Sequence, residues 1–216
     1  MTNNTKKRIY TSIILFLILF LMLIDNYILG FFLIVIGIIS ILEFFRMILK
    51  IFVKENIKAF LINCIYIIYI FVFCSALLVL SNYAHFKLLI FILLLTCIAS
   101  DIGGFAVGKI IKGPKLTNIS PKKTVSGAVG SIVLSILVVN ILVFYFFGTI
   151  NFNTIMVSIF TSVGCQMGDL FFSFLKRKAK IKDTGNILPG HGGVLDRLDG
   201  VFLGIPLGFI TLIILY

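Results

Sequence analysis

The chain has 216 residues, of which 60% are hydrophobic and only 12% are charged, whereas soluble domains average about 45–50% and about 25%. This composition excludes a soluble globular domain and a disordered chain, and it predicts a protein embedded in a lipid bilayer. The net charge of +11 indicates cytoplasmic loops, anionic lipid or a phosphate substrate, and not duplex nucleic acid. The length is that of a single domain, residues 1–216.

Seven apolar runs predict an all-α, polytopic membrane protein with about seven transmembrane helices. The first run, Ile9–Ile24, follows a basic stretch as in a signal peptide, but polar residues 25–27 come next and no small-residue cleavage site is present. We therefore interpret it as an uncleaved span. The other expected spans are residues 27–48, 59–80, 88–107, 127–147, 152–172 and 200–216, which divide into N-terminal spans, 1–94, and a catalytic part, 95–216.

The basic residues sort to one side of the membrane when seven spans are threaded through it. Alternating loops then carry every one of the 19 Lys and Arg residues except Lys87. Because cytoplasmic loops are enriched in Lys and Arg, we expect the N-terminus in the cytoplasm and Tyr216 outside. A different number of spans would scramble this distribution.

Acidic residues gather near the expected cytoplasmic ends of spans four, six and seven. Asp101 and Asp169 interrupt apolar runs, where an ionised carboxylate costs about 2.5–3.5 kcal/mol, so we expect them to share a partner, most simply a metal ion. The alternative is that each lies near the membrane interface or pairs with a lysine of the following loop. Glu43, near the end of the second span, is interpreted as an interfacial ion pair with Arg46. The remaining members of the acidic group are Asp183, Asp196 and Asp199.

A short basic segment, Ser120-Pro-Lys-Lys-Thr124, precedes the fifth apolar run. Hydroxyl and backbone N–H groups at a helix N-terminus attract phosphate, and the adjacent Lys122 and Lys123 add positive charge. These residues therefore indicate a phosphate-binding site. The alternative is a basic cytoplasmic loop whose Ser or Thr only caps the helix.

The sixth apolar run continues into a long polar segment. Asp169, Ser173 and Lys176 recur at helical spacing and share one face if the helix continues. Further on, the glycine-rich stretch around His191 lets the backbone approach a ligand closely. Carboxylates beside cationic side chains are what a metal–phosphate complex needs. The segment supplies them at Arg177, Lys182, Asp183, Asp196, Arg197 and Asp199.

This polar segment, residues 173–199, resembles the C-terminal signature of the phosphatidate cytidylyltransferases, also called CDP-diacylglycerol synthases. The pattern is long and very specific: Ser173-x-x-Lys-Arg-x-x-x-x-Lys182-Asp183-x-Gly-x-x-x-Pro189-Gly-His-Gly-Gly-x-x-Asp196-Arg-x-Asp199. Ser120–Thr124, Asp101 with its following glycines and, more weakly, Glu43–Arg46 resemble further family motifs. The resemblance is strongest over residues 95–216.

The resemblance implies transfer of the cytidylyl group of CTP to phosphatidate, giving CDP-diacylglycerol and pyrophosphate, with Mg²⁺ and room for a second metal ion. It implies a bacterial multi-pass protein of the plasma membrane with its site on the cytoplasmic face, and it leaves a homodimer open. By the same resemblance Asp169 and Asp196 hold the metal, with Asp101 and Asp199 as accessory ligands. The implied catalytic cations are Lys176, Arg177 and Arg197, and the implied substrate-binding residues are Ser120, Lys122, Lys123, Thr124, Ser173, Lys182, Asp183, His191, Gly192 and Gly193.

The sequence departs from the family pattern in two places. Members usually carry Glu where Ser126 stands, so no role of that Glu transfers to this chain. Members are also usually longer, and the shortened region lies between Arg46 and the third span, away from the signature.

Other functions fit the residues less well. A CDP-alcohol phosphatidyltransferase would need its last two aspartates four residues apart, but Asp199 follows Asp196 by three. A transporter would place polar residues across the bilayer instead of at one face. Another CTP-dependent membrane lipid enzyme, either a lipid kinase or a different cytidylyltransferase, remains the alternative.

Overall fold

The protein is all-α in a computed structural model, as the sequence predicts, and the described residues form no strand beyond two isolated bridges. The structure describes residues 3–117, 119–188 and 192–215, with side chains from residue 14 onward. The helices are α1 (Asn3–Ile24), α2 (Asn26–Ile51), α3 (Asn56–Ser81), α4 (Ala84–Ile111), α5 (Val125–Phe147), α6 (Phe152–Lys178), α7 (Leu195–Leu198) and α8 (Val201–Leu215).

Every predicted apolar run is helical. In the described part of the chain, six helices are long and apolar enough to cross a membrane, and Ile14–Ile24 of α1 is a shorter apolar helix. This confirms a polytopic membrane protein with a helix count close to the expected seven. α4 and α6 extend beyond the apolar runs, to Ile111 and Lys178, because hydropathy marks only the part of a helix that lies in hydrocarbon.

The chain forms two compact units that alternate along the sequence. Unit 1 comprises Met1–Leu88 and Leu175–Leu198, and unit 2 comprises Leu89–Phe174 and Asp199–Tyr216. Most of the signature therefore belongs with the N-terminal helices, and α6 contributes residues to both units. The expected single domain over residues 1–216 stays a prediction.

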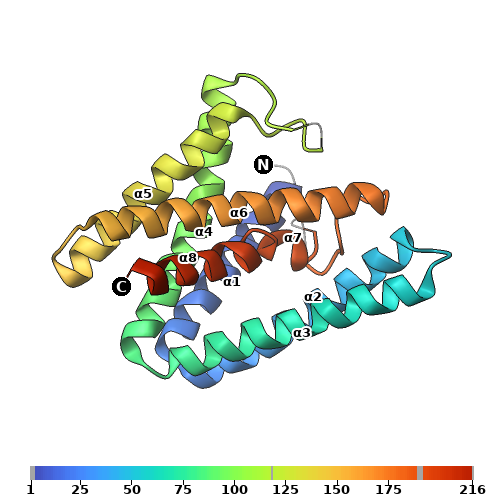
Figure 1. Cartoon of the computed structure of the whole chain (residues 1–216), viewed down its shortest axis with the longest axis horizontal. Coiled ribbons are helices and arrows are strands. Elements are labelled where there is room, and N and C mark those ends of the chain that lie inside the picture. Colours follow the sequence, from blue (N-terminus) through green and yellow to red (C-terminus); the bar gives the residue numbers. More distant parts are fainter. Residues whose placement is uncertain (1–2, 118, 189–191, 216) are drawn as a thin grey trace. The chain divides into compact units, whose positions relative to one another are not determined.

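In unit 1, α2 packs against α3, and the two helices run side by side in Figure 1. Gly37 of α2 lies at this contact, where an added Cβ would be in ordinary van der Waals contact with Ile70 and Cys74 of α3. Near the end of α2, the ring of Phe44 stacks on that of Tyr66, with centroids 3.8 Å apart. Short α7 packs against α2 as well, so this region of α2 receives the signature segment.

In unit 2, α4 and α5 approach each other through glycines, and Figure 1 shows them side by side. A Cβ on Gly103 of α4 would lie 2.5 Å from the carbonyl oxygen of Gly130 of α5. The Ser131 hydroxyl donates to the carbonyl of Ser100 at 2.7 Å, and the hydroxyls of Ser100 and Ser162 of α6 share a hydrogen bond of 2.9 Å. Small residues and hydroxyl groups at such contacts are typical of helices that pack in membranes.

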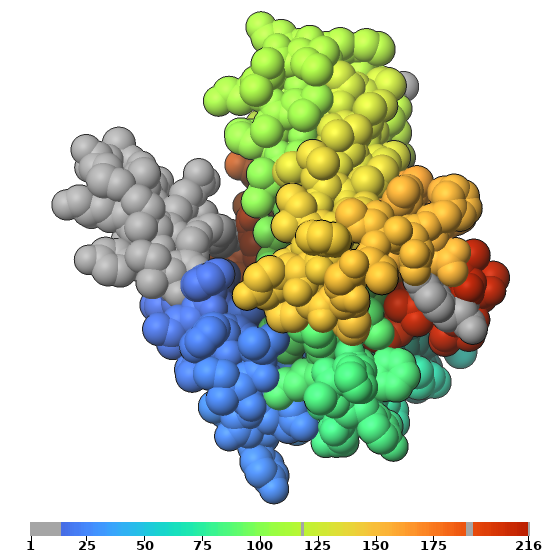
Figure 2. Space-filling model, turned by 90° about the vertical axis from the view of Figure 1, so that its left-hand side faces the viewer, coloured from blue at the N-terminus to red at the C-terminus, as the bar shows by residue number. Residues whose placement is uncertain are grey.

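The loop between α4 and α5 forms the tip of this helix pair, drawn in light green in Figure 2. In the middle of α6, Gly164 lies against Leu203 and Gly204 of α8. Phe172 of α6 also contacts Phe202 of α8, with ring centroids 6.4 Å apart. These contacts place α4, α5, α6 and α8 around one core within unit 2.

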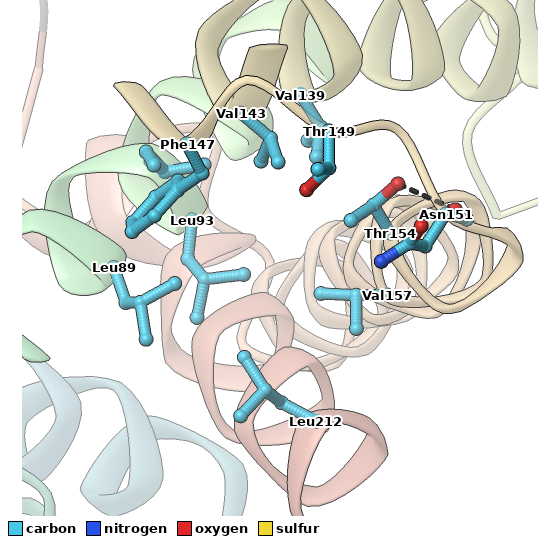
Figure 3. Close-up of a pocket in the computed structure, with 11 residues that line it drawn as sticks. Leu89, Leu93, Val139, Val143, Phe147, Thr149, Asn151, Thr154, Val157 and Leu212 are labelled. Carbon is cyan, nitrogen blue, oxygen red and sulfur yellow. Dashed lines mark hydrogen bonds between the residues drawn. The ribbon is translucent and has the colours of Figure 1, made fainter. Parts of the chain in front are cut away.

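Unit 2 contains an apolar cavity of about 430 Å³ beside the connection between α5 and α6 (Figure 3). The hydroxyl of Thr154 donates to the carbonyl of Asn151 at its polar edge, at 2.7 Å. None of the residues expected to bind phosphate or metal lines this cavity, so it is not the candidate active site. Its apolar walls include Leu89, Leu93, Val139, Val143, Val157 and Leu212.

The sorting of basic residues generates a prediction about topology. Reporter fusions after Lys58, Lys115 and Lys182 should all report the cytoplasm, because these loops carry the excess of Lys and Arg. A fusion after Lys87 is the control and should report the opposite side. An external signal at any of the first three positions would overturn the expected span count.

The contact between Gly103 and Gly130 predicts a sensitive position. Gly103→Val should lower the thermal midpoint of the detergent-solubilised protein, because overpacking of a tight contact costs about 1–3 kcal/mol. Ile102→Val is the control, since Ile102 is 56% exposed on the same helix. An unchanged midpoint for Gly103→Val would show that α4 and α5 do not approach through these glycines.

Candidate functional site

The residues expected to carry chemistry fall into two clusters, one in each unit. The signature cluster lies in unit 1 and comprises Glu43, Lys176, Thr184, Gly193, Val194, Leu195 and Asp196. The loop cluster lies in unit 2 and comprises Asp101, Lys123, Thr124, Ser126, Cys165 and Asp169. Each cluster is built from sequence segments that the linear pattern alone does not connect.

In the signature cluster, Asp196 accepts hydrogen bonds on both carboxylate oxygens. Lys176 Nζ donates to Oδ1 at 2.9 Å. The backbone N–H groups of Thr184 and Gly193 donate to Oδ2 at 2.8 and 3.0 Å. The side chain of Asp196 is only 4% exposed. The carboxylate therefore ties the end of α6 to the start of α7 and fixes the position of the Lys176 ammonium group.

Glu43 of α2 belongs to the same cluster, which corrects the interpretation of this residue as an interfacial partner of Arg46. Arg46 is exposed, whereas Glu43 is 1% exposed. Glu43 accepts hydrogen bonds from the Thr184 hydroxyl at 2.8 Å and from the N–H groups of Val194 and Leu195 at 3.1 and 2.9 Å. Spacing along α2 suggested Arg46, but buried N–H groups from the distant signature offer better compensation to a buried carboxylate.

Leu188 and Gly192 pair through their backbones as an isolated antiparallel bridge. These two residues exchange both of their backbone hydrogen bonds, at 2.9 and 3.1 Å. Gly192 has a φ of 89°, a conformation that favours glycine. The predicted loop organiser His191, with residues 189 and 190, lies outside the described residues.

In the loop cluster, Lys123 Nζ donates to Asp169 Oδ2 at 2.8 Å. The side chains are 32% and 21% exposed, so both remain accessible to a ligand. α6 is one helix through Lys178, as the spacing of Asp169, Ser173 and Lys176 predicts. Asp169 thus pairs with a lysine, but with one from the loop before α5 and not, as the alternative predicts, from the loop that follows α6.

A small hairpin in the loop between α4 and α5 orients Lys123. The N–H of Leu116 donates to the carbonyl of Lys123 at 2.8 Å, and the N–H of Val125 donates to the carbonyl of Pro114 at 3.1 Å. The Thr124 hydroxyl caps α5 by accepting from the N–H of Gly127 at 3.1 Å, which is the capping role foreseen for it. The Ser126 hydroxyl donates to the carbonyl of Lys112, so the residue at the usual Glu position holds the turn that follows α4.

Asp101 and Asp169 both lie beside Cys165 of α6. The Cys165 Sγ is 3.6 Å from Asp101 Oδ1. A Cβ on Gly200 would lie 2.5 Å from Cys165 Sγ and 3.0 Å from Asp169 Oδ1. The glycine at position 200 therefore leaves room for Cys165 and Asp169, and Cys165 in turn contacts Asp101.

The remaining predicted site residues differ in their exposure. Exposed side chains among them can meet a ligand from solvent or the lipid headgroup region; they are Lys122, Arg177, Lys182, Asp183 and Arg197. The partly buried ones are Ser120, Ser173, Gly192 and Asp199.

The donor chemistry for a metal ion differs between the clusters. Within the described residues, no three His, Cys, Asp or Glu side chains form a group that could hold a metal ion. However, Mg²⁺ in a phosphate-transfer site commonly takes one or two carboxylates and completes its shell with water and substrate phosphate. Asp169 and Asp101 fit that donor set. Asp196 fits it less well, because three donors already occupy its oxygens, and its metal role stays a prediction.

Several proteins similar to this chain are named phosphatidate cytidylyltransferase. The chain is 42% identical over 115 residues to a phosphatidate cytidylyltransferase of Helicobacter pylori, covering 52% of this chain and 42% of that protein. It is 38% identical over 127 residues to the protein of that name from Mycobacterium bovis, covering 58% and 42%. It is 41% identical over 129 residues to the one from Rickettsia bellii, covering 55% of each. The chain thus matches about half of the length of these relatives or less.

The sequence model of one protein family matches almost the whole chain. It is described as the cytidylyltransferase family, and the match covers residues 7–215. Both clusters and all the helices that carry them fall within this range. The chain therefore belongs to the cytidylyltransferase family.

Proposed function

We propose that the protein transfers the cytidylyl group of CTP to phosphatidate, forming CDP-diacylglycerol and pyrophosphate. The observation that carries the proposal is the ion pair between Lys123 and Asp169. It joins the Ser120–Thr124 motif to α6 and places a cation and a carboxylate together where both are accessible. Family membership and the names of the relatives support the same reaction.

The reaction needs the neutralisation of charge more than it needs a strong base. A phosphate oxygen of phosphatidate bonds to the α-phosphorus of CTP, while the bond from that phosphorus to the β-phosphate oxygen breaks and pyrophosphate leaves. A phosphate monoester has a second pKa of about 6, so most of it is dianionic at pH 7. The protein must hold two anions together and compensate the charge of the leaving group.

Lys122, Lys123 and Lys176 are the cations that we assign to phosphate. Lys123 and Lys176 each pair with a carboxylate, and each ammonium group carries three N–H donors. Lys122, next to Lys123 in the loop before α5, is exposed. The Lys176 side chain is 12% exposed, against 32% for Lys123, so Lys123 is the more accessible of the two paired lysines.

We assign Mg²⁺ to Asp169 with Asp101, on the donor chemistry of this pair. When bound, the ion would supply positive charge to the phosphates and to the pyrophosphate leaving group. In the described structure Lys123 occupies one oxygen of Asp169, so this lysine also holds the carboxylate in position before substrate arrives. Asp183, Asp199 and Arg197 are assigned accessory roles near phosphate.

The proposal places the reaction at the cytoplasmic face of a bacterial plasma membrane. The sorting of basic residues supports this face. Lys122 and Lys123 lie in the loop before α5, and Lys176 lies near the end of α6. Both regions are expected on the cytoplasmic side. The acyl chains of phosphatidate would stay in the bilayer while the phosphates meet at its surface. A homodimer remains part of the proposal and is tested by the mass of the purified protein in detergent.

One assay tests the reaction against its alternative. Purified protein receives phosphatidate, Mg²⁺ and CTP labelled in either the α- or the γ-phosphate. Label from the α-phosphate in the lipid product, with release of pyrophosphate, is the expected result. Transfer of the γ-phosphate to lipid would instead identify a CTP-dependent lipid kinase and overturn the proposal.

Removal of the loop lysines should weaken phosphate binding. Because a hydrogen bond to a charged group contributes about 1.5–3 kcal/mol, the double variant Lys122→Ala with Lys123→Ala should lower kcat/KM at least about tenfold for CTP, phosphatidate or both. Lys115→Ala, an exposed lysine of the same loop, is the control and should keep wild-type kinetics. Unchanged kinetics of the double variant for both substrates would leave these lysines only a role in topology.

Replacement of the two paired aspartates tests the metal assignment at Asp169 and the role of Asp196 in holding Lys176. Asp169→Asn and Asp196→Asn should each lower kcat at least a hundredfold, about 2.7 kcal/mol. At Asp169 the reason is that a neutral oxygen is a poor ligand for a hard cation, and at Asp196 it is that the amide no longer holds the Lys176 ammonium group by charge. Asp169→Asn should also raise the Mg²⁺ concentration that gives half-maximal activity. The folded, membrane-inserted fraction should stay near that of wild type, since removal of an intramembrane charge does not hinder insertion.

The control for these variants is Glu55→Gln, which alters an exposed carboxylate that pairs only with its neighbour Lys58. It should leave turnover unchanged. Near-normal turnover with unchanged Mg²⁺ dependence in both aspartate variants would return Asp169 and Asp196 to the role of structural ion pairs.

A further inference from the structure

Glu43 is a deeply buried carboxylate that the proposed reaction does not use. It is 1% exposed, and all three of its hydrogen-bond donors come from the signature: the Thr184 hydroxyl and the N–H groups of Val194 and Leu195. No lysine or arginine of the described residues forms an ion pair with it. Burial of a carboxylate is costly unless hydrogen-bond donors compensate its charge. Glu43 of α2 therefore needs the donors of the signature segment, and the segment in turn is held by Glu43.

Two glycines of the signature make this contact possible. A Cβ added at either Gly185 or Gly193 would lie under 3.0 Å from a carboxylate oxygen of Glu43. Such an approach would force the carboxylate or the backbone to shift. The glycines at these two positions are therefore explained by Glu43, whereas the sequence pattern alone assigns Gly193 to close approach of a ligand.

The donors of Glu43 alternate with those of Asp196 along the same backbone. Thr184 gives its hydroxyl to Glu43 and its N–H to Asp196. Gly193 gives its N–H to Asp196, and the next two residues give theirs to Glu43. The segment from Thr184 to Asp196 is thus held between two carboxylates. Asp196 in turn holds Lys176.

We propose that Glu43 is a positioning residue for the binding of a substrate phosphate by Lys176. It fixes the 184–196 segment, so that Asp196 keeps the Lys176 ammonium group in one place. Glu43 itself contacts no substrate. This inference rests on the proposed function, because it assigns Lys176 a phosphate ligand. Loss of Glu43 lowers the fraction of molecules in which Lys176 is positioned to bind phosphate. The apparent dissociation constant of the substrate is the intrinsic constant divided by that fraction, so it rises.

The test is Glu43→Gln in the full chain, with Glu55→Gln as the matched control of an exposed carboxylate. In Glu43→Gln an amide NH₂ group replaces one carboxylate oxygen. This NH₂ group cannot accept the hydrogen bonds that the Thr184 hydroxyl or the N–H groups of Val194 and Leu195 donate to Glu43. The amides of Val194 and Leu195 should therefore exchange hydrogen at least about tenfold faster, as expected for loss of a hydrogen bond to a charged group. KM for CTP or phosphatidate should rise at least about tenfold, while kcat at saturating substrate changes less.

A purely structural role gives a different pattern. A variant that only loses folded protein would lower kcat in proportion to the folded fraction and leave KM unchanged. Unchanged exchange at residues 194 and 195, or unchanged KM for both substrates, would overturn the positioning role. If the wild-type protein forms no CDP-lipid, the proposed function fails. Faster hydrogen exchange in Glu43→Gln would then still show that Glu43 holds the signature segment, but the role of Lys176 in phosphate binding would be lost.

A double-mutant cycle provides a second measurement. Thr184→Val removes one donor to Glu43, and Thr184→Ser keeps it. If Glu43 acts through this segment, Glu43→Gln and Thr184→Val together should raise KM by less than the product of their separate effects, and Thr184→Ser should restore KM to near the wild-type value. Fully multiplicative effects would contradict the coupling.

Discussion

A carboxylate in or next to an apolar helix must find cations or N–H and O–H donors, because its transfer from water is costly. Each unit meets this requirement with groups from a distant part of the chain. In unit 2, Asp169 on α6 receives Lys123 from the loop before α5. In unit 1, Glu43 on α2 receives donors from a segment that follows α6. The polar contacts of the fold are therefore the same contacts that assemble the two clusters.

The sequence predicted the helices well because their signal is local. Each apolar run became a helix, since backbone groups in hydrocarbon can be satisfied only within the helix itself. It also placed Asp169, Ser173 and Lys176 on one continuous helix, and the structure confirms that helix through Lys178. Even the proposed cap at Thr124 was readable from a hydroxyl residue that precedes an apolar run.

The partners of the carboxylates were less predictable, because they depend on tertiary structure. Glu43 was assigned to Arg46 by their spacing along one helix, yet its donors lie about 140–150 residues away along the chain. One signal was available in the sequence: an ionisable residue within an apolar run demands a buried partner. This demand holds for Glu43 as much as for Asp101 and Asp169. The glycines at 185 and 193 could not reveal their purpose until the carboxylate between them was located.

The two paired aspartates differ in a way that separates their roles. Asp196 is 4% exposed and engages a lysine and two backbone N–H groups, so an ion could reach it only by breaking the contacts that order the segment. Asp169 is 21% exposed and its hydrogen bond is to the side chain of Lys123, which can swing aside at little cost in backbone structure. Within unit 2, Asp169 can therefore exchange its cationic partner for another charged ligand, whereas within unit 1 Asp196 holds backbone groups of the signature segment. Glu43 accepts hydrogen bonds from the same segment through Thr184, Val194 and Leu195, so this segment is held from two sides, by a carboxylate of α2 and by one of α7.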